Sequence, residues 1–319
     1  MTKLRLSALL LIVVCGTSFA QAFPSRPLRI VVPFPGGVAD TLARMLSPRM
    51  SEALGQPVVV ENKPGGSGAI GAQEVIRAPA DGHTVFLGHI GTHAVNPHLF
   101  SKLNYDPEKD FAPLTLLITV PNLLVVHPSV PATNVRELVA HAKGKPGALS
   151  YASPGSGSSG HPAAELFKSM AGVDLLHVPY KGAAPALQDL MGGQVQVLFD
   201  TLAQALPQAK AGKVRALAVT TLKRQPVAPE VPTMDEQGFA GWETGPWFGL
   251  FVRTGTPEPA AGRLHAEAVK ALNAAEVRAK LTALGANVAG NSPTEFAAFI
   301  RAEHARWGKV VRDAGIRAD

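Results

Sequence analysis

The chain of 319 residues contains a single cysteine, few aromatic side chains and no long apolar segment. Cys15 lies within the first 22 residues, so the rest of the chain cannot form a disulfide, use a thiolate nucleophile or bind a metal through sulfur. A membrane-spanning helix needs about 20 consecutive apolar residues, and no segment of this sequence reaches that length. These absences exclude disulfide scaffolds and cysteine catalysis in the rest of the chain, and they disfavour an uncleaved membrane anchor.

The sequence also lacks a run of basic residues. Its formal net charge is +6, and the Lys and Arg residues are scattered along the chain. Nucleic-acid-binding proteins usually concentrate positive charge in a patch or stripe, so we expect no nucleic acid partner. A modest positive charge is compatible with a small anionic ligand.

The N-terminus has the layout of a secretory signal. Lys3 and Arg5 precede the apolar run Leu6–Val14, and small residues follow it. We expect residues 1–22 to be a signal peptide cleaved near Ala20 or Ala22, with the mature protein exported. A lipoprotein site at Cys15 is disfavoured because Val14 precedes it instead of a small residue.

Strand-like and helix-like segments alternate along the mature chain, with Gly or Pro at the junctions. In the first part, the apolar patterns predict strands at 28–32, 58–60 and 84–87 and helices at 40–54 and 69–77. Such βαβ alternation is typical of a parallel sheet covered by helices.

A second α/β unit follows, with predicted strands at 150–152, 176–178, 195–199 and 215–219 and helices at 162–171, 183–191 and 201–211. Two extended apolar segments, 114–128 and 247–257, are predicted to cross between the units. Helices are predicted at 258–273, 275–284 and 293–314. We expect lobe 1 to comprise residues 23–122 and 245–319 and lobe 2 to comprise residues 123–244. This architecture suits either a hinged receptor or an enzyme with a cleft.

Gly66, Gly68 and Gly71 form a G-x-G-x-x-G pattern after the second predicted strand. A dinucleotide-binding loop also needs an acidic residue near the end of the next strand, and that strand ends in Leu87-Gly88-His89. A nicotinamide site is therefore disfavoured, and we expect no cofactor.

Three Gly-rich loops join a predicted strand to a helix: PFPGGVAD at 33–40, the loop at 64–71, and SPGSGSSGHPAAEL at 153–166. Ligands of open α/β sheets bind at the carboxyl ends of strands, where these loops lie. Backbone N–H groups at helix N-termini bind anions. Loops facing each other across a cleft could hold a carboxylate from both sides. The alternative that these glycines serve only to form tight, well-packed turns stays open.

Catalytic sites have weaker support. Ser156 and Ser158 lie near His161, so a secreted serine hydrolase is the alternative hypothesis, but no G-x-S-x-G elbow is present. His89, His93 and His98 cluster in sequence without the spacing of a defined metal site. We expect neither a catalytic residue nor a metal.

Taken together, the segments LRIVVPFPGGVADTLAR, GQPVVVENKPGGSGAIGA, SYASPGSGSSGHPAAELF, HVPYKGAAPALQDLMGGQVQVLFD and GKVRALAVTTLKR resemble the tripartite tricarboxylate transporter substrate-binding family, the Bug-type periplasmic solute receptors. The resemblance extends in order over essentially the whole mature chain. It implies the two-lobed type II periplasmic binding protein fold, often compared to a Venus flytrap.

The resemblance also implies a ligand site between the lobes, holding a small carboxylate such as a di- or tricarboxylate, an amino acid or an aromatic acid. The implied lobe 1 residues are Phe34, Pro35, Gly36, Gly37, Asp40, Gly66, Ser67, Gly68, His89, Gly91 and Thr92. The implied lobe 2 residues are Ser153, Ser156, Gly157, Ser158, His161, Tyr180, Lys181 and Asp200. For Asp40 and Asp200, a capping or hinge role is an equal alternative.

By the same resemblance, the partners are one small and one large integral membrane subunit of a permease, or a signalling sensor, and the receptor is a monomer. The sequence departs from the family pattern in two places. Its first loop, PFPGG, is one residue shorter than the usual PFxPGG, and Pro162 follows His161 where Leu is usual. Proline is tolerated in the first turn of a helix, so we expect the fold to be retained.

Overall fold

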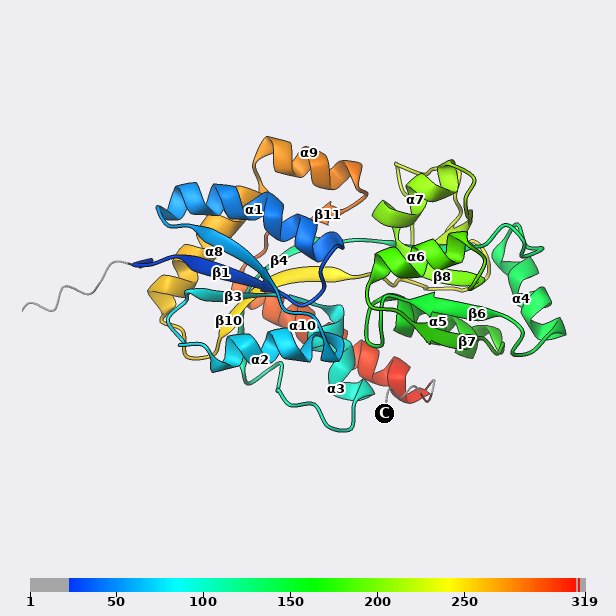
Figure 1. Cartoon of the computed structure of the whole chain (residues 1–319), viewed down its shortest axis with the longest axis horizontal. Coiled ribbons are helices and arrows are strands. Elements are labelled where there is room, and N and C mark those ends of the chain that lie inside the picture. The colour runs from blue at the N-terminus through cyan, green and yellow to red at the C-terminus, as the bar shows by residue number, and fades with distance from the viewer. Residues whose placement is uncertain (1–22, 314, 316–319) are drawn as a thin grey trace, which may run out of the picture.

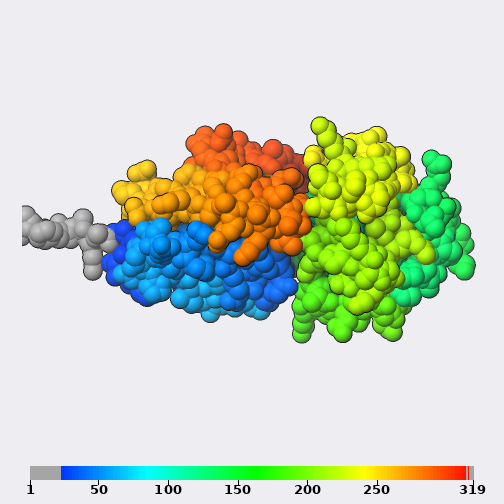
Figure 2. Space-filling view, turned by 90° about the horizontal axis from the view of Figure 1, so that it is seen from above, coloured from blue at the N-terminus to red at the C-terminus, as the bar shows by residue number. Residues whose placement is uncertain are grey.

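The computed structural model describes residues 23–313 and residue 315. Its strands form two separate sheets, each with helices on both faces (Figure 1). We call the six-stranded sheet with its helices lobe 1 and the five-stranded sheet with its helices lobe 2; the two lie side by side and in contact (Figure 2). The predicted two-lobed α/β fold is confirmed, whereas the predicted signal peptide lies outside the described residues.

The lobe 1 sheet has the strand order β11-β4-β10-β3-β1-β2. Its strands are β1 (Leu28–Val32), β2 (Val58–Asn62), β3 (Thr84–His89), β4 (Phe111–Thr119), β10 (Trp247–Arg253) and β11 (Asn287–Val288). The first three strands are parallel, as predicted, but β10 is antiparallel to both β3 and β4. The sheet is mixed because β4 carries the chain toward lobe 2 and β10 brings it back.

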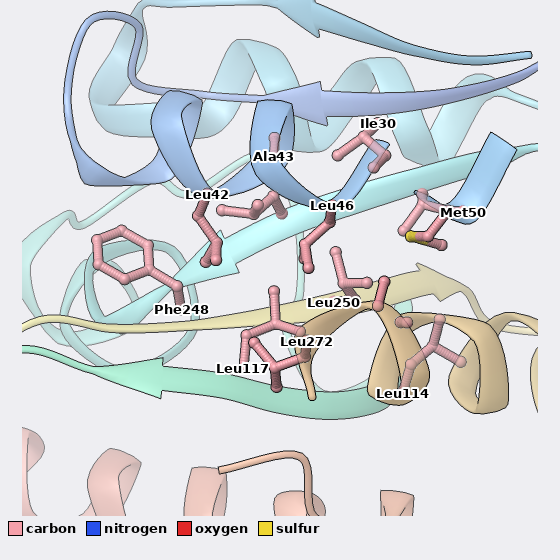
Figure 3. Close-up of a cluster of buried hydrophobic side chains, with 14 of the residues drawn as sticks. Ile30, Leu42, Ala43, Leu46, Met50, Leu114, Leu117, Phe248, Leu250 and Leu272 are labelled. Atoms are coloured by element: carbon pink, nitrogen blue, oxygen red, sulfur yellow. The ribbon is translucent and has the colours of Figure 1, made fainter. Parts of the chain in front are cut away.

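Helices cover both faces of this sheet. One face carries α1 (Val38–Leu54), α8 (Glu258–Leu272) and α9 (Ala275–Ala283), and the other carries α2 (Ala69–Arg77), the π-helical turn η2 (Gly91–Val95), α3 (Asn96–Leu99) and α10 (Pro293–Asp313). Leu42, Leu46 and Met50 are spaced four residues apart on α1, so they share one face and pack on the strands (Figure 3). This packing fixes the position of the N-terminus of α1 relative to the sheet.

The lobe 2 sheet has the strand order β7-β6-β8-β5-β9. Its strands are β5 (Asn122–Val126), β6 (Ser150–Ser153), β7 (Leu176–Pro179), β8 (Val197–Thr201) and β9 (Arg215–Val219). One face packs on α4 (Val135–Gly144) and α5 (Gly160–Ala171), and the other packs on α6 (Ala183–Met191) and α7 (Leu202–Lys210). The helices α5 and α6 begin after the loops that follow β6 and β7, and α7 begins directly after β8. All three helices thus start near the carboxyl ends of strands.

The chain crosses between the lobes twice, after Thr119 and before Trp247. The crossing segments touch each other, because the Val120 N–H donates to the Pro246 carbonyl over 2.8 Å. A β-carbon added to Gly245 would lie 2.3 Å from the Val120 carbonyl oxygen, so the two backbones are in direct contact. The predicted lobe boundaries fall at these crossings, and as domain limits they stay a prediction.

The predicted helices and strands agree with the observed bounds to within two residues at each end. The prediction omitted α4, the helical segment 91–99, the short turn η1 (Gly66–Gly68) and the two-residue strand β11. Within residues 23–313 and 315, no helix combines the length and the apolar character needed to cross a membrane.

Candidate functional site

Two adjoining cavities lie between the lobes. The inner cavity has a volume of ≈ 80 Å³ and the outer cavity a volume of ≈ 550 Å³, and they share Phe34, Pro35, Pro154 and Gly182 in their walls. Lobe 1 contributes to the inner wall Phe34, Pro35, Gly37, Val38, Ala39, His89, Pro246 and Phe248. Lobe 2 contributes Pro154, Ser158, Ser159, Gly182, Ala183, Asp200, Thr201 and Gln204.

The lobe 1 wall of the inner cavity is largely aromatic. The rings of Phe34 and His89 meet edge to face with centroids 4.5 Å apart, and the His89 and Phe248 rings lie 6.2 Å apart. His89 ends β3 and Phe248 lies opposite it on β10, so the sheet itself aligns these two side chains. The wall is therefore shaped by rigid elements, with Phe34 added from the first Gly-rich loop.

His89 is the lobe 1 residue with a polar side chain in this wall. It is 4% exposed, and burial lowers its pKa to about 3, so the imidazole is neutral. Its Nδ1 accepts a hydrogen bond from the Gly91 N–H over 2.8 Å, which places the ring proton on Nε2. Nε2 is buried without a hydrogen-bond partner in the described structure. His89 thus lines the cavity and carries an unsatisfied donor.

Thr92 and Asn96 hold this part of lobe 1 in place. The Thr92 hydroxyl bonds with both the N–H and the carbonyl of His89, closing the turn behind the imidazole. The Asn96 amide donates to the Ser67 carbonyl over 2.8 Å, and the Tyr105 hydroxyl donates to the Thr92 carbonyl over 2.8 Å. These bonds connect the second Gly-rich loop to the turn after β3, and they explain why Thr92 lies behind the cavity wall.

Four helices point their N-termini at the inner cavity: α1 from lobe 1 and α5, α6 and α7 from lobe 2. Their N-caps Gly37, Ser159, Gly182 and Thr201 line the cavity, and none of these side chains caps its helix. By contrast, α4 is capped by Asn134 and α10 by Ser292 and Glu295, both away from the cavity walls. Backbone carbonyls of Ser158 and Pro121 already accept from the His161 and Leu202 N–H groups. The remaining first-turn N–H groups and the helix dipoles together favour an anion at this point.

Asp200 lies at the end of β8, immediately before α7. It is 2% exposed, its Oδ1 accepts from the Thr201 N–H over 2.7 Å, and its Oδ2 is buried without a partner. Burial raises the pKa of Asp200 to about 7, and the Thr201 hydrogen bond opposes this shift. The inner wall thus contains a titratable carboxyl but neither Lys nor Arg.

The outer cavity brings together the second and third Gly-rich loops. Its walls include Gly66 and Ser67 from lobe 1 and Ser156, Tyr180 and Lys181 from lobe 2. Ser67 has a left-handed backbone with φ of 54°, uncommon for a residue other than glycine. Lys181 is exposed, whereas the Tyr180 hydroxyl is fixed by donating to Asp189 over 2.8 Å.

The lobes touch directly at two glycines. A β-carbon on Gly91 would lie 2.4 Å from the Gly157 carbonyl oxygen of the other lobe. A β-carbon on Gly157 would lie 2.3 Å from Asn96 Oδ1, and Gly157 has a φ of +78°. These distances describe a closed arrangement in which the third Gly-rich loop is pressed against lobe 1.

Eight of the predicted site residues lie outside both cavity walls: Gly36, Asp40, Gly68, Gly91, Thr92, Ser153, Gly157 and His161. Asp40 accepts from Arg44 and from Asn62, both at 3.0 Å, which lowers its pKa despite partial burial. These bonds tie α1 to the end of β2. Ser153 bonds with His177 at 2.7 Å, and a side chain at Gly68 would meet Thr92.

The geometry does not support the hydrolase hypothesis. The Ser158 hydroxyl donates to the Gly155 carbonyl over 2.6 Å, and His161 Nδ1 accepts from the Gly157 N–H. His161 is stacked on His177 with centroids 4.3 Å apart, and burial lowers its pKa to about 3. Within the described residues, no hydrogen bond joins the His161 imidazole to the hydroxyl of Ser156 or Ser158, so no activated nucleophile is formed.

Sequence reasoning missed several residues of the inner wall. Phe248 and Pro246 belong to the returning crossing segment, and Gln204 lies in the first turn of α7. Asn96 was also missed, although it contacts the second Gly-rich loop. None of these residues lies in a Gly-rich motif. The sequence indicated a role for them only through their position, since they begin or follow a predicted strand or helix.

Comparison with known proteins decides the family. The model of the tripartite tricarboxylate transporter family receptor matches residues 42–316. A protein of Pseudomonas sp. (strain P51), named after the tcbD-tcbE intergenic region, is 41% identical, covering 94% of this chain and 89% of its own length. The chain belongs to this receptor family. BugT of Bordetella pertussis is 34% identical over 93% of this receptor and 92% of its own length.

Solved structures agree with this assignment. An R. palustris protein solved with adipate has a TM-score of 0.88 and 42% identity, covering 93% of this receptor and 100% of its own chain. MatC from Rhodopseudomonas palustris with bound malate has a TM-score of 0.86 and 40% identity, covering 91% of this receptor and 100% of its own chain. The resemblance inferred from the sequence motifs is confirmed, and with it the fold.

Proposed function

We propose that this protein is a periplasmic solute receptor that captures a small carboxylate between its two lobes and delivers it to a tripartite tricarboxylate-type membrane transporter. The observation that carries the proposal is the inner cavity between the lobes. Four uncapped helix N-termini surround it, and the neutral His89 brings an unpaired donor to its wall. Dicarboxylates bound to two similar proteins give further support.

The physical reason is that this cavity attracts an anion without any Lys or Arg in its inner wall. Each exposed N–H at a helix N-terminus donates a hydrogen bond and carries partial positive charge. Closure of the lobes excludes water, which strengthens each of these hydrogen bonds. A carboxylate has two oxygens and about four acceptor sites, so one group can bond to donors from both lobes at once.

We divide the predicted site residues by their place around the cavities. Phe34, Pro35, Gly37, His89, Ser158 and Asp200 are the proposed inner contacts. Gly66, Ser67, Ser156, Tyr180 and Lys181 are the proposed contacts in the outer cavity. Gly36, Asp40, Gly68, Gly91, Thr92, Ser153, Gly157 and His161 are proposed to act by holding the loops and the lobes in position.

We further propose that the receptor is exported and acts as a monomer without catalysis. Its proposed partners are one small and one large integral membrane subunit, or alternatively a sensor. The family model, described as a receptor of a tripartite transporter, supports the first of these partners. A closed form whose outer surface differs from the open form would be what such a partner recognises.

Isothermal titration calorimetry with malate, adipate, aspartate and citrate tests the function. We expect at least one carboxylate to bind saturably with one site per chain and to raise the melting temperature by mass action. The ligand should be recovered unchanged from the complex. If no carboxylate produces saturable heat, or if a product accumulates, the proposal is rejected.

The role of His89 can be tested separately. In His89→Ala the Nε2 donor is lost, and we expect affinity for the carboxylate to fall about tenfold to 100-fold, since a hydrogen bond to a charged group contributes about 1.5–3 kcal/mol. His89→Gln keeps an N–H donor near the Nε2 position and should retain more of the affinity. Equal affinities of the two variants would show that packing of the ring, and not its donor, matters.

A further inference from the structure

Asp200 is an unusual residue for an anion site. It places a carboxyl at the N-terminus of α7, inside the field that the uncapped helices direct at the ligand. Its Oδ1 is satisfied by the Thr201 N–H, but Oδ2 is buried and has no partner among the described residues. A buried and unsatisfied carboxylate oxygen is unfavourable unless another group pairs with it or a proton neutralises it.

No cation is available to pair with Asp200 from the elements packed around it. Leu123 faces it from β5, and the nearby first turns of α6 and α7 contribute Gly182, Ala183 and Gln204 to the cavity wall. From lobe 1 the only titratable side chain in the wall is His89, which is neutral.

The charged groups farther out do not compensate Asp200 either. Lys181 is exposed at the outer cavity, and Asp40 is paired with Arg44 on α1. Burial is the main cause of the raised pKa of Asp200, and no charged side chain contributes to it. A ligand carboxylate entering this cavity would thus meet a second negative charge without a counterion if Asp200 were ionised.

We propose that Asp200 is a proton-linked specificity residue: it takes up a proton when an anionic ligand binds, and its Oδ2–H then donates to a ligand carboxylate. This inference rests on the proposed function. The proton comes from solvent and returns to it when the ligand leaves, so no other reactant is needed. Without ligand, the positive ends of the helix dipoles stabilise the ionised carboxylate of Asp200 instead of a ligand anion.

The preferred ligand class follows from this arrangement. His89 on lobe 1 and the protonated Asp200 on lobe 2 are both donors, so the inner cavity offers donors from both sides. A molecule with acceptors at this position, such as a dicarboxylate, is preferred over one that presents an ammonium group there. An ammonium group would instead require the ionised form of Asp200, and its affinity would change with pH in the opposite direction.

Calorimetric titration with malate and adipate between about pH 6 and pH 9 tests the proposal, because the ligand carboxylates stay ionised in this range. Affinity should fall by up to about tenfold per pH unit above the pKa of Asp200. Titrations in phosphate and in Tris, whose ionisation heats differ, should show uptake of up to one proton per ligand. Proton release, or a flat profile with no proton uptake, would overturn the proposal.

The variant Asp200→Asn keeps the shape of the side chain and a neutral donor. It should bind at pH 6 about as well as the unchanged protein and bind up to about 100-fold more tightly than it at pH 9, two units above the pKa of Asp200, with no proton uptake. The matched control Asp106→Asn alters a carboxyl outside both cavity walls and should keep the original pH profile. If Asp200→Asn fails to fold, the proton count of the unchanged protein decides alone.

The outcomes separate this inference from the proposed function. If neither ligand binds at any pH, the function and the role of Asp200 are both rejected. If malate or adipate binds tightly with a flat pH profile, only the proton-linked role is rejected. Affinity for aspartate that rises with pH, exceeding that for malate, would show that Asp200 pairs with a cation instead.

Discussion

The two lobes meet the same cavity with different chemistry. Lobe 1 presents aromatic rings, one neutral histidine and the N-terminus of α1, all held by a six-stranded sheet. Lobe 2 presents the N-termini of α5, α6 and α7 together with Asp200, held by a five-stranded sheet. Most of the helix N-termini therefore come from lobe 2, whereas lobe 1 supplies most of the apolar shape.

This difference assigns separate tasks to the lobes. Aromatic rings on strands are rigid, so lobe 1 is suited to limit the size and outline of what enters. Helix N-termini act over the first turn only, so the lobe 2 groups stabilise an anion fully only when the lobes are closed around it. Anything that keeps the lobes apart should remove the contribution of lobe 2 first.

The largest effect is expected for Gly157→Ala. The added β-carbon would meet Asn96 Oδ1 of lobe 1, and the left-handed backbone at this position disfavours any side chain. Because the clash exists only in the closed arrangement, we expect affinity for the carboxylate to fall about 100-fold while lobe 2 stays folded. Calorimetry measures the affinity of the variant, and circular dichroism shows whether it is folded.

Gly172→Ala is the matched control. Gly172 also has a positive φ, +62°, but a β-carbon there would meet nothing within 4 Å, and it ends α5 away from lobe 1. It should lower the free energy of unfolding by about 1 kcal/mol and leave affinity unchanged. Equal losses of affinity in the two variants would show that lobe contact at Gly157 is irrelevant to binding.

A smaller effect is expected when a negative charge is added to the lobe 2 wall. Ala183 lies in the first turn of α6 and lines the inner cavity. In Ala183→Asp the new carboxylate would interact with the helix dipole in place of the ligand and repel the ligand's own carboxylate. We expect affinity for a dicarboxylate to fall about tenfold, measured by calorimetry at constant ionic strength. The control Arg136→Glu adds an acid to the first turn of α4, outside both cavity walls, and should leave affinity unchanged.

The smallest effect is expected for stability in acid. Burial lowers the pKa of His89 in lobe 1 and of His161 in lobe 2 to about 3, against an ordinary 6.5. The unfolded chain therefore binds more protons than the folded one between these values, so stability is lost as pH falls below about 6.5. Asp200, whose pKa is raised to about 7, works in the opposite direction and offsets part of this loss.

Thermal unfolding followed by tryptophan fluorescence measures this loss for each lobe. We expect the melting temperature to fall on the order of 5 °C or more between about pH 7 and pH 5. Trp242 packs in the lobe 2 core, whereas Trp247 and Trp307 pack in lobe 1, so Trp242→Phe leaves only lobe 1 reporters. Because each lobe buries neutral histidines, both should respond; a response from one lobe alone would contradict this reasoning.

The sequence predicted most of the fold because its elements obey simple periodicity. Leu42, Leu46 and Met50 mark one face of α1, and short apolar runs mark β5, β8 and β9 of lobe 2. The helical segment 91–99 was missed because its buried residues include Thr92, His93 and Asn96, whose polarity hides the pattern. The pattern of Asn134 followed three residues later by Glu137 is typical of a helix N-terminus, so the sequence does contain a signal for the start of α4.

The candidate site was predictable only in part. The Gly-rich loops identified Phe34, Gly37 and Ser158 as neighbours of a cleft, because such loops follow strand ends. The protonation states of His89 and Asp200 depend on burial and on single hydrogen bonds, which spacing does not determine. Phe248 reaches the site through the antiparallel register of β10, a long-range pairing that no local pattern encodes.

The contact between Gly245 and the Val120 carbonyl has a mechanical consequence. With the two crossing backbones this close and joined by the Val120–Pro246 hydrogen bond, they cannot slide past each other without breaking that bond. Rotation about this point keeps that bond, so we expect the lobes to move by rotation and not by sliding. A rotation of this kind would link the presence of a ligand to the angle between the lobes.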